Sequence, residues 1–433
     1  MSEELLRMCV DAKRAARRLA ALPAETKQRA LEAMAVALER REEELLAANA
    51  RDQERAEPLV RGGEMSEALY KRLALGADKL RGLRDGVRAV RALPDPTGQT
   101  LLRMELDEGL ILRRVSCPIG VLGVIFESRP DVNVQIAALA IKSGNAVILK
   151  GGAEAAESNA ALLTVMSDAL ATVEGFPERA LQQISSREAV QELLEMDGLV
   201  DLVIPRGSKG FIRHIMDHSR IPVMGHADGV CHVFVAEDAP LETAVKVVVD
   251  SKVDYPAACN AAETLLVERA GAARLLPPIC AALEAAGVEV RGCPEARAVV
   301  AGLPPASAED WDAEYLDLIL SVRVVDDLEQ AIDHIHRHGS AHTEAIVTSS
   351  AEKAEAFLQR VDAADVFHNA STRFADGFRF GFGAEVGIST SKLHARGPVG
   401  LEGLVTYKYE LRGEGHCAAD YGPGKRSFTH RRL

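Results

Sequence analysis

Several signals that would assign this chain to a particular class of protein are absent from its sequence. A basic surface is missing, because the formal net charge is −13 and the pI is near 5.5, which argues against nucleic acid as the main partner. No apolar run reaches the length of a membrane span, and the first residues lack the pattern of a signal peptide. The 7 cysteines show no CxxC spacing, which fits neither a disulfide framework nor a zinc site. We therefore expect a cytoplasmic protein without a nucleic-acid or membrane partner.

The residues that are present are typical of a soluble globular protein with more than one domain. The 433 residues exceed a single hydrophobic core, and hydrophobic (47%) and charged (27%) residues occur at ordinary levels. Residues 3–56 follow a helical period, and a further helical pair extends to about residue 92. Two strand-like runs, 101–106 and 110–115, predict a hairpin. An isolated hairpin is marginal in water, so we expect it to pack on something else, such as another subunit.

Beyond Pro118 the pattern becomes a regular alternation of strands and helices, which predicts a parallel, doubly wound α/β sheet. Ligands of such sheets bind at the carboxyl ends of the strands, where Lys150 and the segment Arg206-Gly207-Ser208 fall. The Gly-x-Gly-x-x-Gly fingerprint is absent. Gly207 and Ser208 could still offer backbone N–H groups to a phosphate, although any short strand-to-helix turn could look the same. The predicted strands are 121–126, 146–150, 181–184, 199–205 and 222–225, and the predicted helices are 131–143, 155–173, 188–196 and 207–218.

A second α/β unit is predicted from about residue 227 to residue 390. After it, residues 401–409 predict a strand, and the polar, glycine-rich segment from Gly413 onward is expected to be loosely ordered. The predicted strands of the second unit include 264–267, 318–325 and 344–347, and its helices include 244–249 and 328–337.

One cysteine of this unit, Cys259, lies in the segment 253–261 between a predicted helix and a predicted strand. Its neighbours are small, which leaves a thiol accessible to a substrate. A single cysteine in an intracellular protein is nevertheless more often a small buried apolar residue, and no base adjoins Cys259 in the sequence. Cys231 and Cys280 lie in apolar runs and are predicted to be core residues.

A second constellation, His334 and His338, shares one helix face but is not predicted to bind a metal. Gly339 follows as a C-terminal cap, and the helix dipole favours histidines in a last turn. No carboxylate pattern accompanies the two histidines. We therefore interpret them as residues of a helix end.

Five motifs occur in order along the chain and together resemble those of the γ-glutamyl phosphate reductases, a family of the aldehyde dehydrogenase superfamily. The motifs are Phe126-Glu127-Ser128-Arg129-Pro130 and the segments 225–232, 253–261, 369–374 and 393–401. The resemblance implies an aldehyde dehydrogenase-like α/β fold with a Rossmann-like, NADP-binding domain over 1–226, in which the hairpin 100–116 is an oligomerisation element. It further implies a catalytic domain over 227–395 and a C-terminal return strand and tail, also for oligomerisation, over 396–433.

The resemblance implies reduction of L-glutamyl 5-phosphate by NADP(H) to the 5-semialdehyde, through a thioester on Cys259. Where aldehyde-oxidising relatives carry a Glu that activates water, this chain has His226-Ala227-Asp228-Gly229, which favours a reductase. The alternative is that His226 or Asp228 replaces that base. Where those relatives carry an oxyanion-holding Asn, this chain has Arg129, whose guanidinium suits a phosphate leaving group. A purely structural Arg129 is the other interpretation.

The same resemblance implies roles for residues that bind cofactor and substrate. Lys150 would hold the adenosine ribose region of NADP, Glu314 would hold the nicotinamide ribose, and Gly207 and Ser208 are the candidate phosphate turn. The superfamily's ribose-binding Glu has no counterpart, which favours NADP, although Glu154 lies next to that position. Candidate substrate ligands, for which structural roles remain open, are Asn369, Ser371, Thr372 and Arg373.

A homo-oligomer is implied, and a glutamate 5-kinase is a candidate partner that would supply the labile acyl phosphate. Two other interpretations stay open. The chain could act on a different acyl phosphate or acyl thioester, or it could be a catalytically silent subunit of the superfamily. Retention of Cys259, Arg129 and Lys150 together weighs against the silent subunit.

Overall fold

The computed structural model describes residues 2–226 and 228–433, and the chain divides into two compact units. Unit 1 comprises Met1–Met224 and Val399–Leu433, and unit 2 comprises Gly225–Pro398. The C-terminal segment, predicted as a separate part, is thus grouped with unit 1. None of the described helices combines the length and the apolar character needed to cross a bilayer.

Unit 1 begins with a layer of helices, as the helical period of the sequence predicts. In α1 the apolar residues Leu5, Cys9, Ala12 and Leu19 recur on one buried face, and the Ser2 side chain caps the helix by accepting the Leu5 N–H at 3.2 Å. The helices of unit 1 are α1 (Glu3–Leu19), α2 (Ala24–Arg40), α3 (Glu42–Arg61), α4 (Glu67–Leu73), α5 (Ala77–Ala92), α6 (Asp131–Lys142), α7 (Ala156–Ala171), α8 (Arg187–Leu193) and α9 (Lys209–His218).

A parallel sheet in the order β5-β4-β3-β6 forms the centre of unit 1, which confirms the predicted doubly wound unit. Its strands are β3 (Val121–Phe126), β4 (Ala146–Lys150), β5 (Leu181–Gln183) and β6 (Leu202–Arg206). Strand β3 is buried along its whole length because helices cover both faces of such a sheet. Lys150 pairs with Ile125, and Arg206 pairs with Phe126, so these two cations lie on either side of the same strand end. The prediction of a strand at 222–225 is wrong: only an isolated bridge between Val203 and Val223 forms there.

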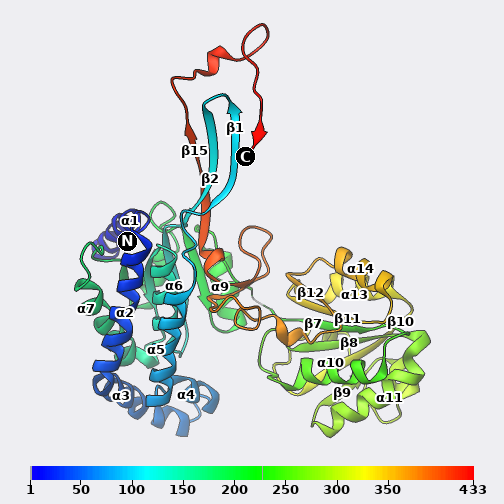
Figure 1. Cartoon of the computed structure of the whole chain (residues 1–433). Coiled ribbons are helices and arrows are strands. Elements are labelled where there is room, and N and C mark those ends of the chain that lie inside the picture. The colour runs from blue at the N-terminus through cyan, green and yellow to red at the C-terminus, as the bar shows by residue number, and fades with distance from the viewer. Residues whose placement is uncertain (1, 227) are drawn as a thin grey trace. The chain divides into compact units, whose positions relative to one another are not determined.

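A separate antiparallel sheet in the order β15-β2-β1-β16 contains the predicted hairpin (Figure 1). Its strands are β1 (Thr100–Asp107), β2 (Leu110–Pro118), β15 (Val405–Arg412) and β16 (Arg431–Arg432). The strand predicted at 401–409 starts later than expected, because Leu401–Leu404 forms a 3-10 turn. The tail is more ordered than its composition predicts, since Arg431 pairs with Glu105 at 2.6 Å and Arg426 pairs with Asp107 at 2.6 Å.

Unit 2 contains a parallel sheet in the order β12-β11-β7-β8-β10-β9, with helices on both faces (Figure 1). Alternate residues of a strand face opposite sides. Val233 and Leu265 therefore pack with α10 and α11, whereas Phe234 and Leu266 pack with α13 and α14. The helices and strands of unit 2 are β7 (Cys231–Val235), α10 (Leu241–Val253), β8 (Ala262–Glu268), α11 (Arg269–Ala285), β9 (Glu289–Gly292), α12 (Pro294–Val299), β10 (Ile319–Val325), α13 (Leu328–His338), β11 (Thr343–Val347), α14 (Ala351–Arg360), β12 (Asp365–His368) and β13 (Gly387–Ser389), and β14 (Gly397–Val399) lies at the boundary with unit 1.

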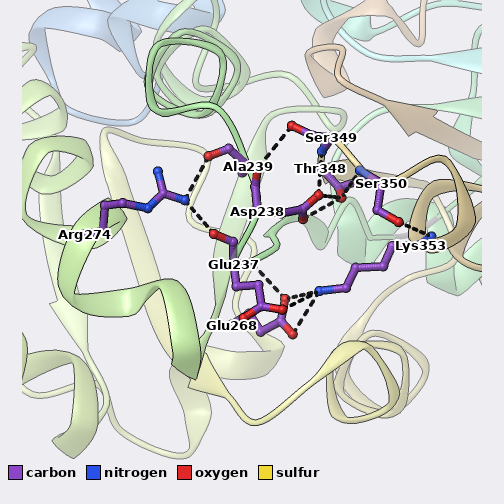
Figure 2. Close-up of polar contacts among 9 residues, drawn as sticks. All are labelled: Glu237, Asp238, Ala239, Glu268, Arg274, Thr348, Ser349, Ser350 and Lys353. Carbon is purple, nitrogen blue, oxygen red and sulfur yellow. Dashed lines mark hydrogen bonds and ion pairs between the residues drawn. The ribbon is translucent and has the colours of Figure 1, made fainter.

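The carboxyl ends of β7, β8 and β11 in unit 2 are joined by a dense polar network (Figure 2). Asp238 accepts hydrogen bonds from the Thr348 hydroxyl at 2.7 Å and from the Ser349 N–H at 3.0 Å. Lys353 pairs with Glu268 at 2.9 Å and with Glu237 at 3.3 Å. Lys353 at this edge of the sheet is therefore paired with carboxylates, and Asp238 is held by neutral hydroxyl and backbone N–H groups.

Candidate active site

Cys259 lies in the turn between α10 and β8, at the amino end of β8, and its thiol is free and half-buried. The backbone of this turn is held by contacts with Cys231 and Gly229. The Cys231 thiol donates to the Cys259 carbonyl oxygen at 3.3 Å, and Gly229 packs so closely that an added Cβ would lie 2.7 Å from the Cys259 Cα. Only glycine fits this position. The turn is therefore fixed in place while its sulfur stays accessible.

A buried ion pair joins the two ends of this turn. Lys252 of α10 and Glu263 of β8 are both fully buried, and Lys252 Nζ lies 2.5 Å from Glu263 Oε2. Burial raises the pKa of Glu263 to about 7 and lowers the pKa of Lys252, because the low-dielectric interior disfavours both charged forms. The pair connects the last turn of the helix to the strand across the Cys259 segment.

Glu314 belongs to the same assembly. Its Oε1 atom accepts the Gly229 N–H at 3.0 Å, and Gly229 is the residue that packs on the Cys259 backbone. Glu314, a candidate cofactor ligand, is therefore bonded to the glycine that packs on the Cys259 backbone.

Arg373 contacts the turn from another direction. Its guanidinium bonds to Asp254 Oδ2 at 3.2 Å and to the Asn260 side chain, and Asn260 directly follows Cys259. The Asn260 amide in turn donates to the Ala375 carbonyl at 2.8 Å. Arg373 is thus brought next to Cys259, as a candidate substrate ligand requires, although it already has protein partners.

The other predicted substrate ligands are used inside unit 2. Asn369 donates to and accepts from the Thr348 backbone at 3.0 and 3.1 Å, and adopts a left-handed φ of 54°. The Ser371 hydroxyl accepts the Ser251 hydroxyl at 3.3 Å, and the Thr372 N–H donates to the same Ser251 hydroxyl at 3.1 Å. Ser371 and Thr372 are buried. These contacts anchor the segment that carries Arg373.

Two histidines lie beside Cys259, and sequence reasoning missed one of them. A ring nitrogen of His226, a ring nitrogen of His342 and Cys259 Sγ all lie within 4.8 Å of one another. His226 comes from the motif 225–232, of which Ala227 lies outside the described residues. His342 directly precedes β11. The signal that would have located it is the parallel pairing of β7 with both β8 and β11, which places the amino ends of these strands together.

In unit 1 the predicted cofactor residues lie at the carboxyl ends of β4 and β6. Lys150 is half-buried, and burial lowers the pKa of its amine. Gly151 and Gly152 follow it, and an added Cβ on Gly151 would lie 2.8 Å from the Asn159 Cγ. Glu154 accepts the Ser128 N–H at 2.7 Å and the Ser128 hydroxyl. The carboxylate nearest Lys150 in the sequence is therefore engaged by Ser128.

The turn at Gly207 and Ser208 also contacts a carboxylate of its own chain. The Ser208 N–H donates to Glu127 Oε2 at 2.8 Å, and an added Cβ on Gly207 would lie 2.8 Å from the Glu127 Cδ. A phosphate at this helix start would have to displace Glu127 as the acceptor. Arg129, from the same motif as Glu127, is half-exposed and bonds to Asp131 at 3.1 Å.

Comparison with known proteins identifies the family. Residues 1–292 match the aldehyde dehydrogenase family, which is more than half of the chain. The chain belongs to the aldehyde dehydrogenase family. It is 58% identical over 421 residues to a γ-glutamyl phosphate reductase of Synechococcus sp. (strain JA-2-3B'a(2-13)), covering 97% of this chain and 92% of that protein. It is 52% identical over 426 residues to the γ-glutamyl phosphate reductase of Acetivibrio thermocellus, covering 98% of this chain and 97% of that protein.

A solved structure agrees with this assignment. The crystal structure of γ-glutamyl phosphate reductase from Thermotoga maritima matches with a TM-score of 0.93 and 41% identity, covering 96% of this chain and 100% of that one. The resemblance and the aldehyde dehydrogenase-like α/β fold predicted from the sequence are both confirmed, and the chain is an oxidoreductase of this family. The family uses a nicotinamide cofactor, which agrees with the predicted class of cofactor.

Proposed function

We propose that this enzyme reduces L-glutamyl 5-phosphate to L-glutamate 5-semialdehyde and phosphate, a step from glutamate towards proline, with NADPH as the reductant. The observation that carries the proposal is the Cys259 turn, in which an accessible thiol is held by a fixed backbone in a chain whose full-length relatives are γ-glutamyl phosphate reductases. A covalent intermediate on sulfur divides a difficult reduction into two easier steps.

In the proposed reaction, Cys259 Sγ attacks the acyl carbon and the phosphate leaves, which forms a thioester. The nicotinamide cofactor, when bound, supplies the hydride that reduces the thioester. Collapse of the resulting thiohemiacetal releases the aldehyde and restores the thiolate of Cys259. Arg129 is the proposed partner of the leaving phosphate, because its half-exposed guanidinium bonds to Asp131 through one terminal nitrogen.

The residues of unit 1 are compatible with NADP. Lys150 offers a cation at a strand end, where ligands of parallel sheets bind, and the glycines that follow it, Gly151 and Gly152, make room for the Asn159 and Glu154 side chains. Glu154, the carboxylate that could otherwise take the ribose hydroxyls, is bonded to Ser128. This supports NADP over NAD, because a carboxylate directed at the ribose would repel a 2′-phosphate. Gly207 and Ser208 remain a proposed phosphate contact that requires Glu127 to yield its hydrogen bond.

For the substrate, Arg373 is the proposed partner of the α-carboxylate, because it lies against the residue after Cys259. We propose that Asn369, Ser371 and Thr372 place Arg373, since their polar groups bond to Thr348 and Ser251. We propose Glu314 as both a nicotinamide-ribose ligand and a support for Gly229.

The antiparallel sheet of unit 1 is the proposed oligomerisation surface. Its strand β15 exposes Tyr407, Tyr409 and Leu411, and β1 exposes Leu101. Exposed apolar groups gathered on one sheet favour association with another copy. A cytoplasmic location is proposed because a thiol nucleophile needs a reducing compartment, and a glutamate 5-kinase remains the proposed source of the acyl phosphate.

The test runs the reaction in reverse on the full-length protein. Glutamate 5-semialdehyde, inorganic phosphate and NADP⁺ are supplied, and NADPH formation is followed. We expect turnover that requires phosphate, is slower with NAD⁺, and disappears in Cys259→Ala, while Cys280→Ala, which removes a buried thiol of α11, keeps it. Turnover without phosphate would indicate hydrolytic oxidation instead. Turnover only with another acyl phosphate or thioester would change the substrate, and no turnover with any carbonyl compound would indicate a silent subunit.

A further inference from the structure

The cluster of His226, Cys259 and His342 contains two histidines that the proposed reaction does not use. Their imidazole rings meet edge to face, with centroids 4.7 Å apart and planes at 78°. All three residues belong to unit 2 and lie at the amino ends of adjacent parallel strands. The question is which ring nitrogen can exchange a proton with the thiol.

His342 has the available nitrogen. Its side chain is fully buried, Nδ1 lies 2.8 Å from the Thr343 hydroxyl, and Nε2 is buried without a hydrogen-bond partner. A buried polar atom left unpaired destabilises the folded state, so it calls for an explanation. The tautomer that donates from Nδ1 to the Thr343 hydroxyl leaves a lone pair on Nε2, which is the form that accepts a proton.

His226 is held differently. Its Nδ1 lies 2.9 Å from the Ile388 carbonyl oxygen, which only accepts, so Nδ1 carries a proton and donates it. The residue is half-buried in the segment before β7. This arrangement fixes the His226 ring against His342. The neutral ring then carries its lone pair on Nε2, as in His342, so the two histidines differ in burial and not in tautomer, and the His226 variant below tests which of them takes the proton.

We propose that His342 is the proton acceptor for the Cys259 thiol, an inference that rests on the proposed function only for the identity of the acyl donor. As the sulfur–carbon bond forms, Nε2 takes the thiol proton. As the carbon–oxygen bond to the leaving group breaks, the same proton passes to the departing phosphate oxygen, so that hydrogen phosphate leaves and His342 is neutral again. The thiolate that is released with the aldehyde takes one proton from solvent.

Transfer of the thiol proton to His342 would increase the fraction of Cys259 that is thiolate. In water a thiol is mostly protonated near neutrality, and an adjacent imidazole is the usual group that shifts it to the thiolate. Other titratable groups on the packed elements also act on the cluster, and the experiment must separate them from His342. Among the described residues these include Asp228 of the His226 segment, Cys231 and His232 of β7, Lys252 of α10, Asp254 of the turn, Glu263 of β8, Glu314, Glu344 of β11, Asp365 of β12 and Arg373.

The test measures thiol reactivity without substrate or cofactor. Full-length protein is treated with iodoacetamide over a range of pH, and alkylation of the Cys259 peptide is quantified by mass spectrometry. We expect His342→Asn and His342→Gln to move the midpoint of the rate profile upward by about one pH unit and to slow alkylation near neutrality about tenfold. His226→Asn, the matched control on the neighbouring ring, should move the midpoint by less than about a third of that.

Superimposable profiles for wild type and both folded His342 variants would overturn the proposal, as would a larger effect of His226→Asn. If the His342 variants do not fold, the wild type decides: the thiolate absorbance that distinguishes it from Cys259→Ser should appear well below the pH of an ordinary thiol, and its appearance at the ordinary pH would overturn the proposal. Because no substrate is present, a failure of the reductase assay leaves this result intact, and the reverse also holds.

Discussion

The two parallel sheets of this protein use opposite edges. In unit 1 the candidate ligands, Lys150 and the turn at Gly207 and Ser208, lie at the carboxyl ends of β4 and β6. In unit 2 the corresponding edge is occupied by Asp238, Lys353 and their partners, and Cys259 lies at the amino end of β8 (Figure 2). The same strand–helix alternation therefore gives unit 1 a candidate ligand edge and gives unit 2 an edge whose charged groups are engaged by the protein itself.

The carboxylates at these sites also differ in how they could respond to a ligand. In unit 1, Glu127 accepts the N–H of the exposed Ser208, a hydrogen bond that a ligand can replace, whereas Glu154 accepts the N–H of the buried Ser128. In unit 2, Glu263, which follows the Cys259 turn, is fully buried against Lys252. We infer that an edge that binds a ligand needs hydrogen bonds that the ligand can replace. A turn that carries a proposed nucleophile instead needs a rigid support, here the buried Lys252–Glu263 pair.

The largest expected effect tests the buried Lys252–Glu263 pair as the rigid support of the Cys259 turn. Lys252→Met should lower the free energy of unfolding by about 3–5 kcal/mol, because it leaves Glu263 buried without its partner. The measurement is denaturant unfolding of the full chain at neutral pH. Lys246→Met, on the exposed face of the same helix, is the control and should change little. Recovery of stability in the double variant Lys252→Met/Glu263→Leu would show that the loss comes from the unpaired charge. No loss in the single variant would contradict the claim that the buried pair is a rigid support in unit 2.

A second prediction concerns Asp365, a buried acid of unit 2. Burial raises its pKa from 3.8 to about 7, and its Oδ2 atom has no hydrogen-bond partner. The folded state therefore holds a proton that the unfolded state releases, so stability falls as the pH rises from 3.8 to about 7. Asp365→Asn should remove this fall, adding about 2–4 kcal/mol above pH 7 and nothing below the pKa of the unfolded carboxyl.

Unfolding midpoints measured across this pH range check the second prediction. Asp362→Asn is the matched control, because Asp362 pairs with Lys392 and Arg396 and these cations lower its pKa. Its loss should be unfavourable at neutral pH, the opposite sign to Asp365→Asn. Equal pH dependence in wild type and Asp365→Asn would contradict the assignment.

A third prediction tests the packing of Gly229 on Cys259. An added Cβ would lie 2.7 Å from the Cys259 Cα, so Gly229→Ala must displace the turn. A misplacement of about 1 Å at a reacting group costs on the order of 100-fold in rate. We expect that loss in kcat with little change in the KM for the cofactor. Gly76→Ala, where no atom lies within 4 Å of the added Cβ, should keep the wild-type rate.

The smallest expected effect tests whether a ligand can replace Glu127 as the acceptor of the Ser208 N–H in unit 1. Glu127→Gln keeps an acceptor for the Ser208 N–H but removes the charge that would oppose a phosphate. NADPH should bind about two- to fivefold more tightly, the size of a single charge at a helix start. Binding is measured by titration of the full-length protein, with the exposed Glu174→Gln as the control. Weaker binding in Glu127→Gln would mean that the carboxylate supports the cofactor, which would end the contrast drawn between the two edges.

Much of the architecture follows from local pattern. The strand β4 occurs where 146–150 was predicted, and the hairpin β1–β2 and the helix α13 agree within a few residues, because apolar periodicity and turn residues act over short distances. The start of β15 was placed too early, since the apolar run at Leu401–Leu404 is also compatible with the 3-10 turn that forms. The order of the tail was underestimated, because its strand exists only by pairing with β1.

The site divides in the same way. The sequence by itself determined the fold class, the resemblance and the choice of Cys259, because these depend on residue types in a fixed order. It could not assign contacts to Asn369, Ser371 and Thr372, whose polar groups bond to residues more than 20 positions away in the chain.

Only the tertiary structure decided the surroundings of the thiol. Parallel pairing of β7 with β8 and β11 brings His226 and His342 beside Cys259, although they lie 33 and 83 residues away from it in the chain. Pairing between distant strands depends on the whole hydrophobic core and leaves no short-range periodicity in the sequence. For that reason the sequence was enough to propose Cys259 as the nucleophile, and it was not enough to propose His342 as its base.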